Sequence, residues 1–279
     1  MMRQQLIMQQ KGVHPEKVVS KDGTPIAYWR SGQGPPLVLV HGTAADHTRW
    51  KPVLPTLEEH FTVYAIDRRG RGGSGDSSEY AIEREFEDVA SVVGSIREPV
   101  NLLGHSYGAL CSLEAALLTS NVRKLVLYEP PVRAGVDLYP SGTIHRLEAL
   151  LDAGDRDEVV TTFMGEIAKV RPGDLRLLQS LPAWKARVAA AHTIPREMRA
   201  DEDYFFDPQR FKMLTMPTLL LVGGDSPRFL KVASAAVYAA LPDAKIAAML
   251  GQQHAAMDTG TEVFTTEVLR FLKRPEQSV

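Results

Sequence analysis

The sequence is poor in the features that mark secreted, membrane-spanning or fibrous proteins. It has one cysteine, Cys111, among 279 residues, so no disulfide can form within the chain. That count predicts a reducing, cytoplasmic location. No apolar run approaches the ~18 residues that a membrane-spanning helix needs. The opening residues, MMRQQLIMQQKG, contain no apolar stretch of signal-peptide length. We expect residues 1–15 to form a loose N-terminal segment.

The sequence also has no excess of basic charge. Lys and Arg number 32, Asp and Glu number 34, and the formal net charge is −2. A protein that binds the phosphate backbone of nucleic acids needs a basic surplus, so no nucleic acid is expected as a partner. Because no apolar run is long enough to span a membrane, no membrane is expected either. Hydrophobic residues make up 44% of the chain and charged residues 24%, which is typical of a globular domain. The composition carries no signal for a particular oligomeric state.

Short apolar runs alternate with segments of helical periodicity. The runs lie at 36–40, 61–67, 100–104, 125–129, 218–223 and 245–250. Because they are apolar on both faces, they predict parallel strands covered by helices. Apolar residues recur at helical spacing over 82–96 and 264–272. Near the start, two strand-like segments flank Asp22-Gly23, which predicts a hairpin at an antiparallel edge.

The alternation stops between residues 131 and 210. Apolar residues there recur at helical spacing, and no strand pattern is evident. We therefore expect an α/β core of mostly parallel strands built from 16–130 and 211–275, with a helical cap inserted at 131–210.

One motif in this sequence predicts a catalytic residue because of the strand and helix that are expected on either side of it. GHSYG at 104–108 follows a predicted strand and opens an apolar helix that continues to Leu118. In a strand–turn–helix context, G-x-S-x-G places the serine on a sharp turn at the carboxyl edge of the sheet. This setting predicts that Ser106 is a nucleophile.

A nucleophilic serine needs a base, and the base needs a group that orients it. His254 follows the last predicted strand, and Asp225 follows the strand before it. Both lie at the carboxyl ends of strands, the same edge as Ser106, so we predict that they are the base and the acid. Glu129, at the end of another strand, is the alternative acid. The oxyanion needs two N–H donors, for which the backbone of Tyr107 and Thr43 are the candidates.

These features together resemble the α/β-hydrolase family, in its capped, single-domain branch of serine hydrolases and esterases. The resemblance covers about residues 20–275 and includes HGT at 41–43, the glycine-rich loop 67–75, the serine motif, GGD at 223–225 and the final histidine. Family order is serine, acid, histidine, which implies the triad Ser106, Asp225 and His254. It also implies that no cofactor and no metal are needed. One departure is Gln253, since many relatives have glycine directly before this histidine.

The resemblance implies a hydrolase that cleaves small or medium carboxylic esters or lactones through an acyl-enzyme on Ser106. Carbon–carbon bond hydrolysis, or a cofactor-free perhydrolase or haloperoxidase-like activity with the same triad, is an alternative. A ligand-binding receptor on the same fold is a second alternative from another class. Haloalkane dehalogenases and epoxide hydrolases use an aspartate nucleophile, so Ser106 argues against both.

Two further patterns are weak. GRGGSG at 70–75 spells a dinucleotide-binding motif, but no helix begins at its last glycine, so no nucleotide site is expected. His41, Asp46 and His47 lack the spacing of a known metal motif, so no metal is expected.

Overall fold

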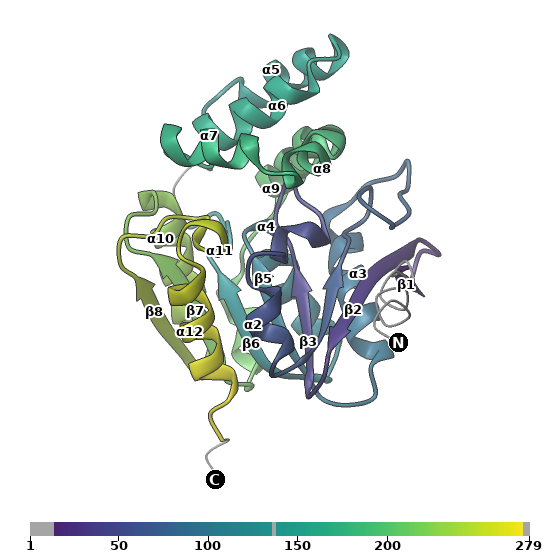
Figure 1. Ribbon diagram of the computed structural model, residues 1–279, viewed down its shortest axis with the longest axis vertical. Coiled ribbons are helices and arrows are strands. Elements are labelled where there is room, and N and C mark those ends of the chain that lie inside the picture. Colours follow the sequence, from purple (N-terminus) through teal and green to yellow (C-terminus); the bar gives the residue numbers. More distant parts are fainter. Residues whose placement is uncertain (1–13, 136–137, 276–279) are drawn as a thin grey trace, which may run out of the picture.

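A computed structural model describes residues 14–135 and 138–275 of the chain. Of the N-terminal segment predicted to be loose, residues 1–13 lie outside the described residues, as do residues 136–137 of the predicted cap. A twisted sheet runs through the centre of the molecule, and helices cover it on both faces and along one edge (Figure 1). In the described part of the chain, no helix is both long and apolar enough to span a membrane.

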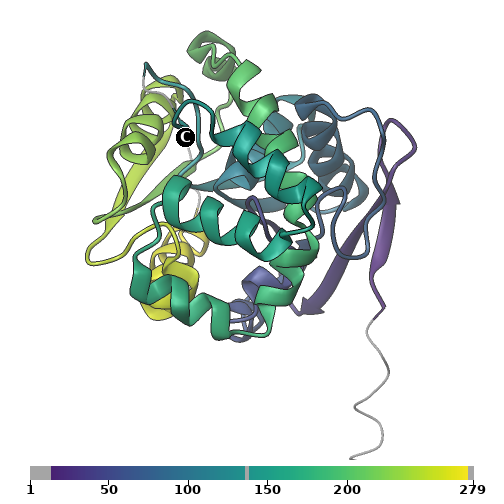
Figure 2. The ribbon, with the colours of Figure 1, turned by 90° about the horizontal axis from the view of Figure 1, so that it is seen from above.

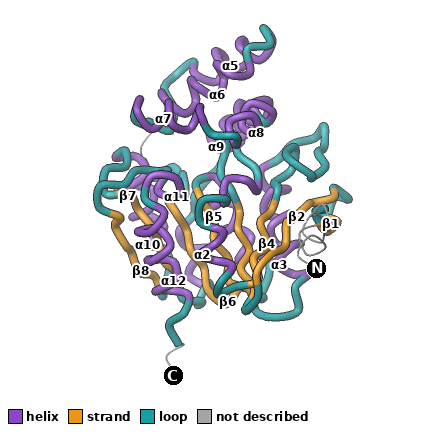
Figure 3. Tube along the Cα trace, viewed as in Figure 1, coloured by secondary structure: helices purple, strands orange, loops and turns teal. Residues whose placement is uncertain are grey.

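The described residues form one eight-stranded sheet in the order β1-β2-β4-β3-β5-β6-β7-β8. β1 and β2 form the antiparallel hairpin that the sequence predicts, β2 pairs antiparallel with β4, and the other neighbours are parallel. Figure 3 shows the strands side by side in the core. The strands are β1 Glu16–Val19, β2 Pro25–Gly32, β3 Pro36–Val40, β4 Thr62–Ile66, β5 Val100–His105, β6 Val122–Tyr128, β7 Thr218–Gly223 and β8 Ala244–Met249.

Alternation along the buried strands divides the core into two layers. In β3, Val38 and Val40 point to one face and Leu37 and Leu39 to the other. The first face is covered by α3 Ile82–Ser95, α4 Tyr107–Leu118 and α10 Arg228–Ala240. The second is covered by α2 Leu54–Glu58 and α12 Thr261–Leu272, with η2 His47–Trp50 and α11 Ala256–Thr259 near its upper edge. Both layers are needed because the parallel strands are apolar on both faces.

The last strand differs from the expectation. β8 was expected to be buried on both faces, but only Met249 is buried and Ile246 is 47% exposed. The reason is its position, since β8 pairs only with β7 and forms the edge of the sheet. An apolar run in the sequence does not distinguish a central strand from an edge strand.

Helices between β6 and β7 form a separate layer above the sheet, and we refer to α5–α9 as the insertion helices. Seen from above, they lie across the core (Figure 2). No strand occurs among the described residues of this stretch. The helices have their own apolar core. Ala44, from the part of the chain that forms the sheet (the sheet domain), packs in this core. The elements are α5 Thr143–Asp152, α6 Arg156–Thr162, the π-helix η3 Phe163–Ile167, α7 Pro172–Ser180, α8 Ala183–Ala189, η4 Ala191–Thr193 and α9 Ile194–Asp203, followed by η5 Pro208–Met213.

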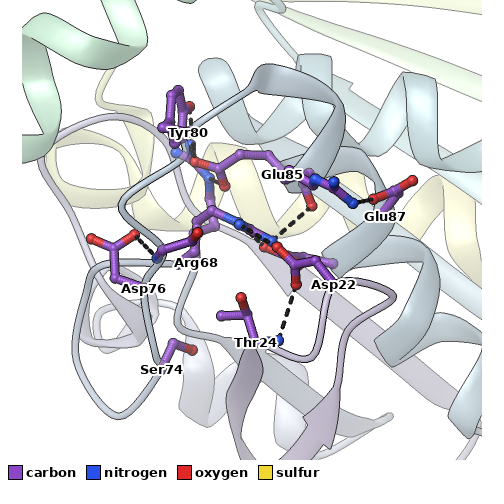
Figure 4. Close-up of polar contacts among 12 residues, drawn as sticks. Asp22, Thr24, Arg68, Ser74, Asp76, Tyr80, Glu85 and Glu87 are labelled. Carbon is purple, nitrogen blue, oxygen red and sulfur yellow. Dashed lines mark hydrogen bonds and ion pairs between the residues drawn. The ribbon is translucent and has the colours of Figure 1, made fainter.

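A buried charge cluster ties the insertion helices to the sheet domain. Arg68, just after β4, donates to both carboxylate oxygens of Glu85 on α3, at 3.0 and 2.8 Å. The same guanidinium donates to Glu197 on α9 at 2.7 Å, and Arg71 also pairs with Glu197. Figure 4 shows Arg68 and Glu85 within this cluster. All four side chains are buried, so each charge depends on the others for compensation.

The electrostatics of this cluster follow from burial and pairing. Burial and the neighbouring Arg68 lower the pKa of Arg71 to about 10. Burial by itself would raise the pKa of Glu85, but the charges of Arg68 and Arg71 outweigh it and hold that pKa below its ordinary value. Two guanidinium groups therefore share two carboxylates, one from α3 and one from α9. Loss of either carboxylate would leave an uncompensated buried positive charge.

We predict that Glu197→Gln lowers the free energy of unfolding by about 3 kcal/mol, because the buried arginines keep only Glu85. Urea denaturation followed by circular dichroism measures the change. Arg199→Gln, on the same helix, is the matched control, since Arg199 makes an exposed ion pair with Glu148 and should matter little. Equal losses in the two variants would mean that the buried cluster does not hold the insertion helices.

Candidate active site

Ser106 occupies a strained turn between β5 and α4. Its backbone has φ 56° and ψ −128°, a conformation that residues with a side chain rarely adopt. Glycines make the turn possible: a Cβ on Gly108 would lie 2.3 Å from the carbonyl oxygen of His41, and one on Gly104 would lie 2.4 Å from that of Gly108. The amide of Ser106 donates to the Tyr128 carbonyl oxygen at 2.8 Å. The serine therefore sits at the helix N-terminus, where the peptide dipoles favour negative charge.

His254 is paired with Glu129. The imidazole Nδ1 lies 2.5 Å from Glu129 Oε2, and the other carboxylate oxygen, Oε1, accepts from the amide of Gly223 at 2.8 Å. Glu129 is completely buried, and its φ of 48° turns its side chain away from the line of β6. A buried carboxylate with two donors is the arrangement that holds an imidazole in one orientation.

Besides Glu129, Tyr128 at the end of β6 also holds the loop that carries His254. The Tyr128 hydroxyl donates to the carbonyl oxygen of Gln253 and accepts from the amide of Ala256 at 3.3 Å. The neighbouring His105 ring also contacts this loop, with Nε2 2.8 Å from the His254 carbonyl oxygen. Burial and the nearby His254 lower the pKa of His105 well below its ordinary value, so the ring is neutral. His105 and Tyr128 are supporting residues that the sequence analysis did not identify.

Asp225, the acid predicted from the sequence, does not contact His254. It is exposed, and no hydrogen bond of its carboxylate is found among the described residues. Its backbone does contribute, because its amide donates to the Gln252 carbonyl oxygen at 2.9 Å and its own carbonyl accepts from Gln253 at 3.1 Å. The chain turns sharply after β7, which brings the backbone of Asp225 to the histidine loop and leaves its side chain in solvent. The structure thus brings the alternative acid, Glu129, to the histidine.

The two candidate oxyanion donors have no competing partner. Neither the amide of Thr43 nor that of Tyr107 donates to an acceptor among the described residues. The orientation of the Thr43 amide follows from His41, whose Nδ1 lies 2.8 Å from the Gly42 carbonyl oxygen. Because N–H and C=O point in opposite directions across a trans peptide, holding the Gly42 carbonyl fixes the direction of the Thr43 N–H.

His41 is itself held in one form. The amide of Arg68 donates to its Nε2 at 3.1 Å, which leaves Nδ1 as the protonated nitrogen. Burial, followed by the charges of Arg68 and Arg71, lowers the pKa of His41 well below its ordinary value. The ring is therefore neutral and acts as a donor to the Gly42 carbonyl. This tautomer connects the buried charge cluster to the candidate oxyanion site.

Ser106, His254, Thr43 and Tyr107 line one small cavity between the sheet domain and the insertion helices. Its volume is about 60 Å³, room for roughly four waters. Much of the wall is apolar and comes from the π-helix and the residues after it, with Phe163, Met164, Ile167 and Val170, and from Phe229 and Leu230 of α10. A π-turn widens the helix locally and often marks a functional site. The sequence periodicity predicted this segment as an ordinary helix.

The two weak sequence patterns, the histidine–aspartate group and the glycine-rich loop, have structural roles in the described residues. Asp46, His47 and Asp67 offer ligand atoms within 4.8 Å of one another. These groups already bond to protein: Asp67 pairs with His47 at 2.7 Å and accepts from the Gly73 amide, and Asp46 accepts from Thr48. The glycine-rich loop closes on Asp67, and the next helix, α3, begins only at Ile82.

Comparisons with known proteins agree with this geometry. The chain matches the model of the family described as "Alpha/beta hydrolase family" over residues 37–266. It is 25% identical to a 2-hydroxy-6-oxo-6-(2'-aminophenyl)hexa-2,4-dienoic acid hydrolase of Metapseudomonas resinovorans, over 97% of this chain and 95% of the relative. An alpha/beta hydrolase of Sphaerobacter thermophilus superposes with a TM-score of 0.80 and 35% identity, covering 92% of this chain and 100% of its own. An esterase of Exiguobacterium antarcticum has a TM-score of 0.77 and 25% identity, covering 94% and 100%.

We predict opposite effects for alanine at two helical glycines. Gly108→Ala should lower the free energy of unfolding by about 2 kcal/mol, because the new methyl group would overlap the His41 backbone. Gly94→Ala should raise it by up to about 1 kcal/mol, since that site in α3 is open and alanine favours helix. Thermal or urea denaturation measures both. A stable Gly108→Ala variant would contradict the tight packing of the serine turn.

Proposed function

Because the chain belongs to the alpha/beta hydrolase family, we propose that it is a serine hydrolase that forms an acyl-enzyme on Ser106. The observation that carries the proposal is the His254–Glu129 pair, whose imidazole lines the same cavity as a serine held at a strained helix N-terminus. A nucleophile, a base with an orienting acid, and two unengaged N–H donors are the parts that acyl transfer requires.

In the proposed mechanism, the Nε2 atom of His254 takes the hydroxyl proton as Ser106 Oγ attacks the substrate carbonyl carbon. Glu129 keeps Nδ1 protonated and stabilises the imidazolium that forms. The amides of Thr43 and Tyr107 stabilise the oxyanion. Collapse of the tetrahedral intermediate passes the proton to the leaving group and gives the acyl-enzyme. Water, deprotonated by His254, then releases the acid and restores the serine.

Glu129 is the better candidate for the acid on electrostatic grounds. A carboxylate that is buried and bonded to the imidazole interacts with it in a low dielectric, whereas an exposed carboxylate is screened by water. Asp225 then has a structural role, through its backbone bonds to the loop that carries His254.

Esters and lactones of small or medium size are the proposed substrates. A small cavity beneath the insertion helices suits a bounded substrate better than a polymer. The esterase from Exiguobacterium antarcticum, with 25% identity over 94% of this chain, supports ester chemistry.

Carbon–carbon bond hydrolysis is the second candidate. It is favoured by the relative from Metapseudomonas resinovorans, which is similar over 97% of this chain and whose name describes a hydrolase of a hexa-2,4-dienoic acid. In such a reaction the cleaved bond would join a carbonyl carbon to another carbon, and the leaving carbanion would need a proton.

Labelling with a fluorophosphonate tests the proposal directly. We expect one adduct, on Ser106, by intact mass and peptide mapping, together with turnover of short p-nitrophenyl esters. Ser106→Ala should lose the adduct and about 10⁶-fold of kcat. An adduct without ester turnover would favour carbon–carbon cleavage, and the absence of any adduct would favour a binding protein over an enzyme.

Paired carboxylate variants test the acid. We expect Glu129→Gln to lower kcat by up to about 10⁴-fold, because the amide can no longer stabilise the imidazolium. Asp225→Asn, the matched control, should keep near wild-type kcat, since only its backbone contacts the histidine loop. The reverse order of effects would restore Asp225 as the acid.

A further inference from the structure

Two arginines line the cavity and have no role in the proposed triad: Arg49, which is paired with Asp258, and Arg187. Arg187 lies on α8, among the insertion helices, and lines the same cavity as Ser106 and His254. Its residue surface is only 5% exposed. Nη1 donates to the carbonyl oxygen of Ala44 at 3.1 Å, across the boundary between the insertion helices and the sheet domain. A guanidinium has five N–H donors, so one bond leaves most of them unused.

Arg187 differs from every other buried arginine of the described residues, because it has no carboxylate partner. Each of the others is paired: Arg49 with Asp258, Arg68 with Glu85 and Glu197, Arg69 with Asp88, and Arg71 with Glu197. The other two nitrogen atoms of Arg187, Nε and Nη2, have no hydrogen-bond partner among the described residues. Both retain some solvent-accessible surface. A buried, unpaired guanidinium beside a nucleophile is costly unless a ligand supplies the missing charge.

The carboxylates of Asp258 and Asp46 lie near enough to raise the pKa of Arg187, but neither forms an ion pair with it. Arg49 also lines the cavity, and its own partner is Asp258 on α11. Asp46 accepts from the backbone and hydroxyl of Thr48. Burial and the neighbouring Arg49 lower the pKa of Arg187 to about 10, so the side chain keeps its charge at neutral pH. Arg187 is therefore a charged group of the cavity wall that has no ion-pair partner of its own among the described residues.

We propose that Arg187 forms a carboxylate-binding subsite, so that the substrate of this hydrolase carries an anionic carboxylate beside the acyl group that Ser106 attacks. This inference rests on the proposed function. A single cation matches a monoanion, and the planar guanidinium fits a carboxylate with two parallel hydrogen bonds. The rest of the ligand would lie against Phe163, Met164 and Leu230, which are apolar.

The position of Arg187 also limits the length of that substrate. Its contact on the sheet domain, Ala44, directly follows Thr43, the proposed oxyanion donor. Ala44 has a φ of 52°, a left-handed backbone conformation that sets the course of the chain just after Thr43. The carboxylate would therefore bind close to the oxyanion site, with few carbons between it and the scissile carbonyl. A cavity of about 60 Å³ agrees with a short connecting chain.

The first experiment compares charged and neutral esters with the wild-type chain. Monomethyl and dimethyl esters of succinate, glutarate and adipate differ only in one carboxylate, and their hydrolysis can be followed by NMR. We expect kcat/KM for the monomethyl ester to exceed that for the dimethyl ester by about tenfold to hundredfold at the best chain length. Preference for the dimethyl ester at every length would overturn the proposal without any variant.

Variants then test whether Arg187 is responsible. Arg187→Gln should reduce the ratio of kcat/KM for charged over neutral ester by at least about tenfold. Arg187→Lys should restore part of it, because the charge remains while the forked geometry is lost. Arg199→Gln, which removes an exposed arginine of α9 outside the cavity, is the control and should keep the wild-type ratio. An unchanged ratio in folded Arg187→Gln would assign the preference to another group.

A binding measurement separates this inference from the proposed reaction. In Ser106→Ala, isothermal titration with monomethyl glutarate and dimethyl glutarate requires no turnover. We expect the charged ester to bind at least about tenfold more tightly, and the double variant Ser106→Ala with Arg187→Gln to lose that difference. Selective binding without ester turnover in the wild type would keep the subsite and refute the esterase activity. Equal binding of the two esters would refute the subsite alone.

Discussion

The geometry of the candidate active site depends on the interactions of one buried carboxylate, that of Glu129. It has no contact with water, so it is stable only if donors reach both of its oxygens. The Gly223 amide at the end of β7 and the His254 ring after β8 are those donors. One residue at the end of β6 therefore joins the carboxyl ends of three strands. The left-handed backbone of Glu129 is the local strain that this arrangement requires.

The same rule for buried charges explains how the insertion helices are held. Arg68 and Arg71 sit between α3 and α9, and each pairs with a carboxylate. The amide of Arg68 also fixes the tautomer of His41, which orients the Gly42–Thr43 peptide. Placement of the insertion helices and preorganisation of the oxyanion site thus share one cluster of residues. Among the buried arginines that the structure describes, Arg187 has no carboxylate partner, and it lines the same cavity as Ser106 and His254.

The fold places these parts together for a topological reason. In a parallel sheet, successive strands end at the same edge, so residues distant in sequence meet there. The insertion leaves the sheet between β6 and β7 and returns above that edge, as Figure 1 shows. It contributes Phe163, Met164 and Arg187 to the cavity wall, while the sheet domain contributes Ser106, His254 and the apolar residues Phe229 and Leu230. The cavity is therefore built from both parts of the chain.

The sequence by itself determined the strands of the sheet, the serine turn and the histidine, because each depends on a local pattern: apolar runs, GHSYG, and a histidine just after a strand. Only the tertiary structure shows that Glu129, and not Asp225, contacts the His254 ring. Both follow strands, and the difference lies in one backbone dihedral angle and in the turn after β7. Packing between distant segments likewise decided the edge position of β8 and the π-turn. It also left Arg187 without a carboxylate partner among the described residues. Side-chain direction and pairing are properties of neighbours in space, which a linear pattern does not specify.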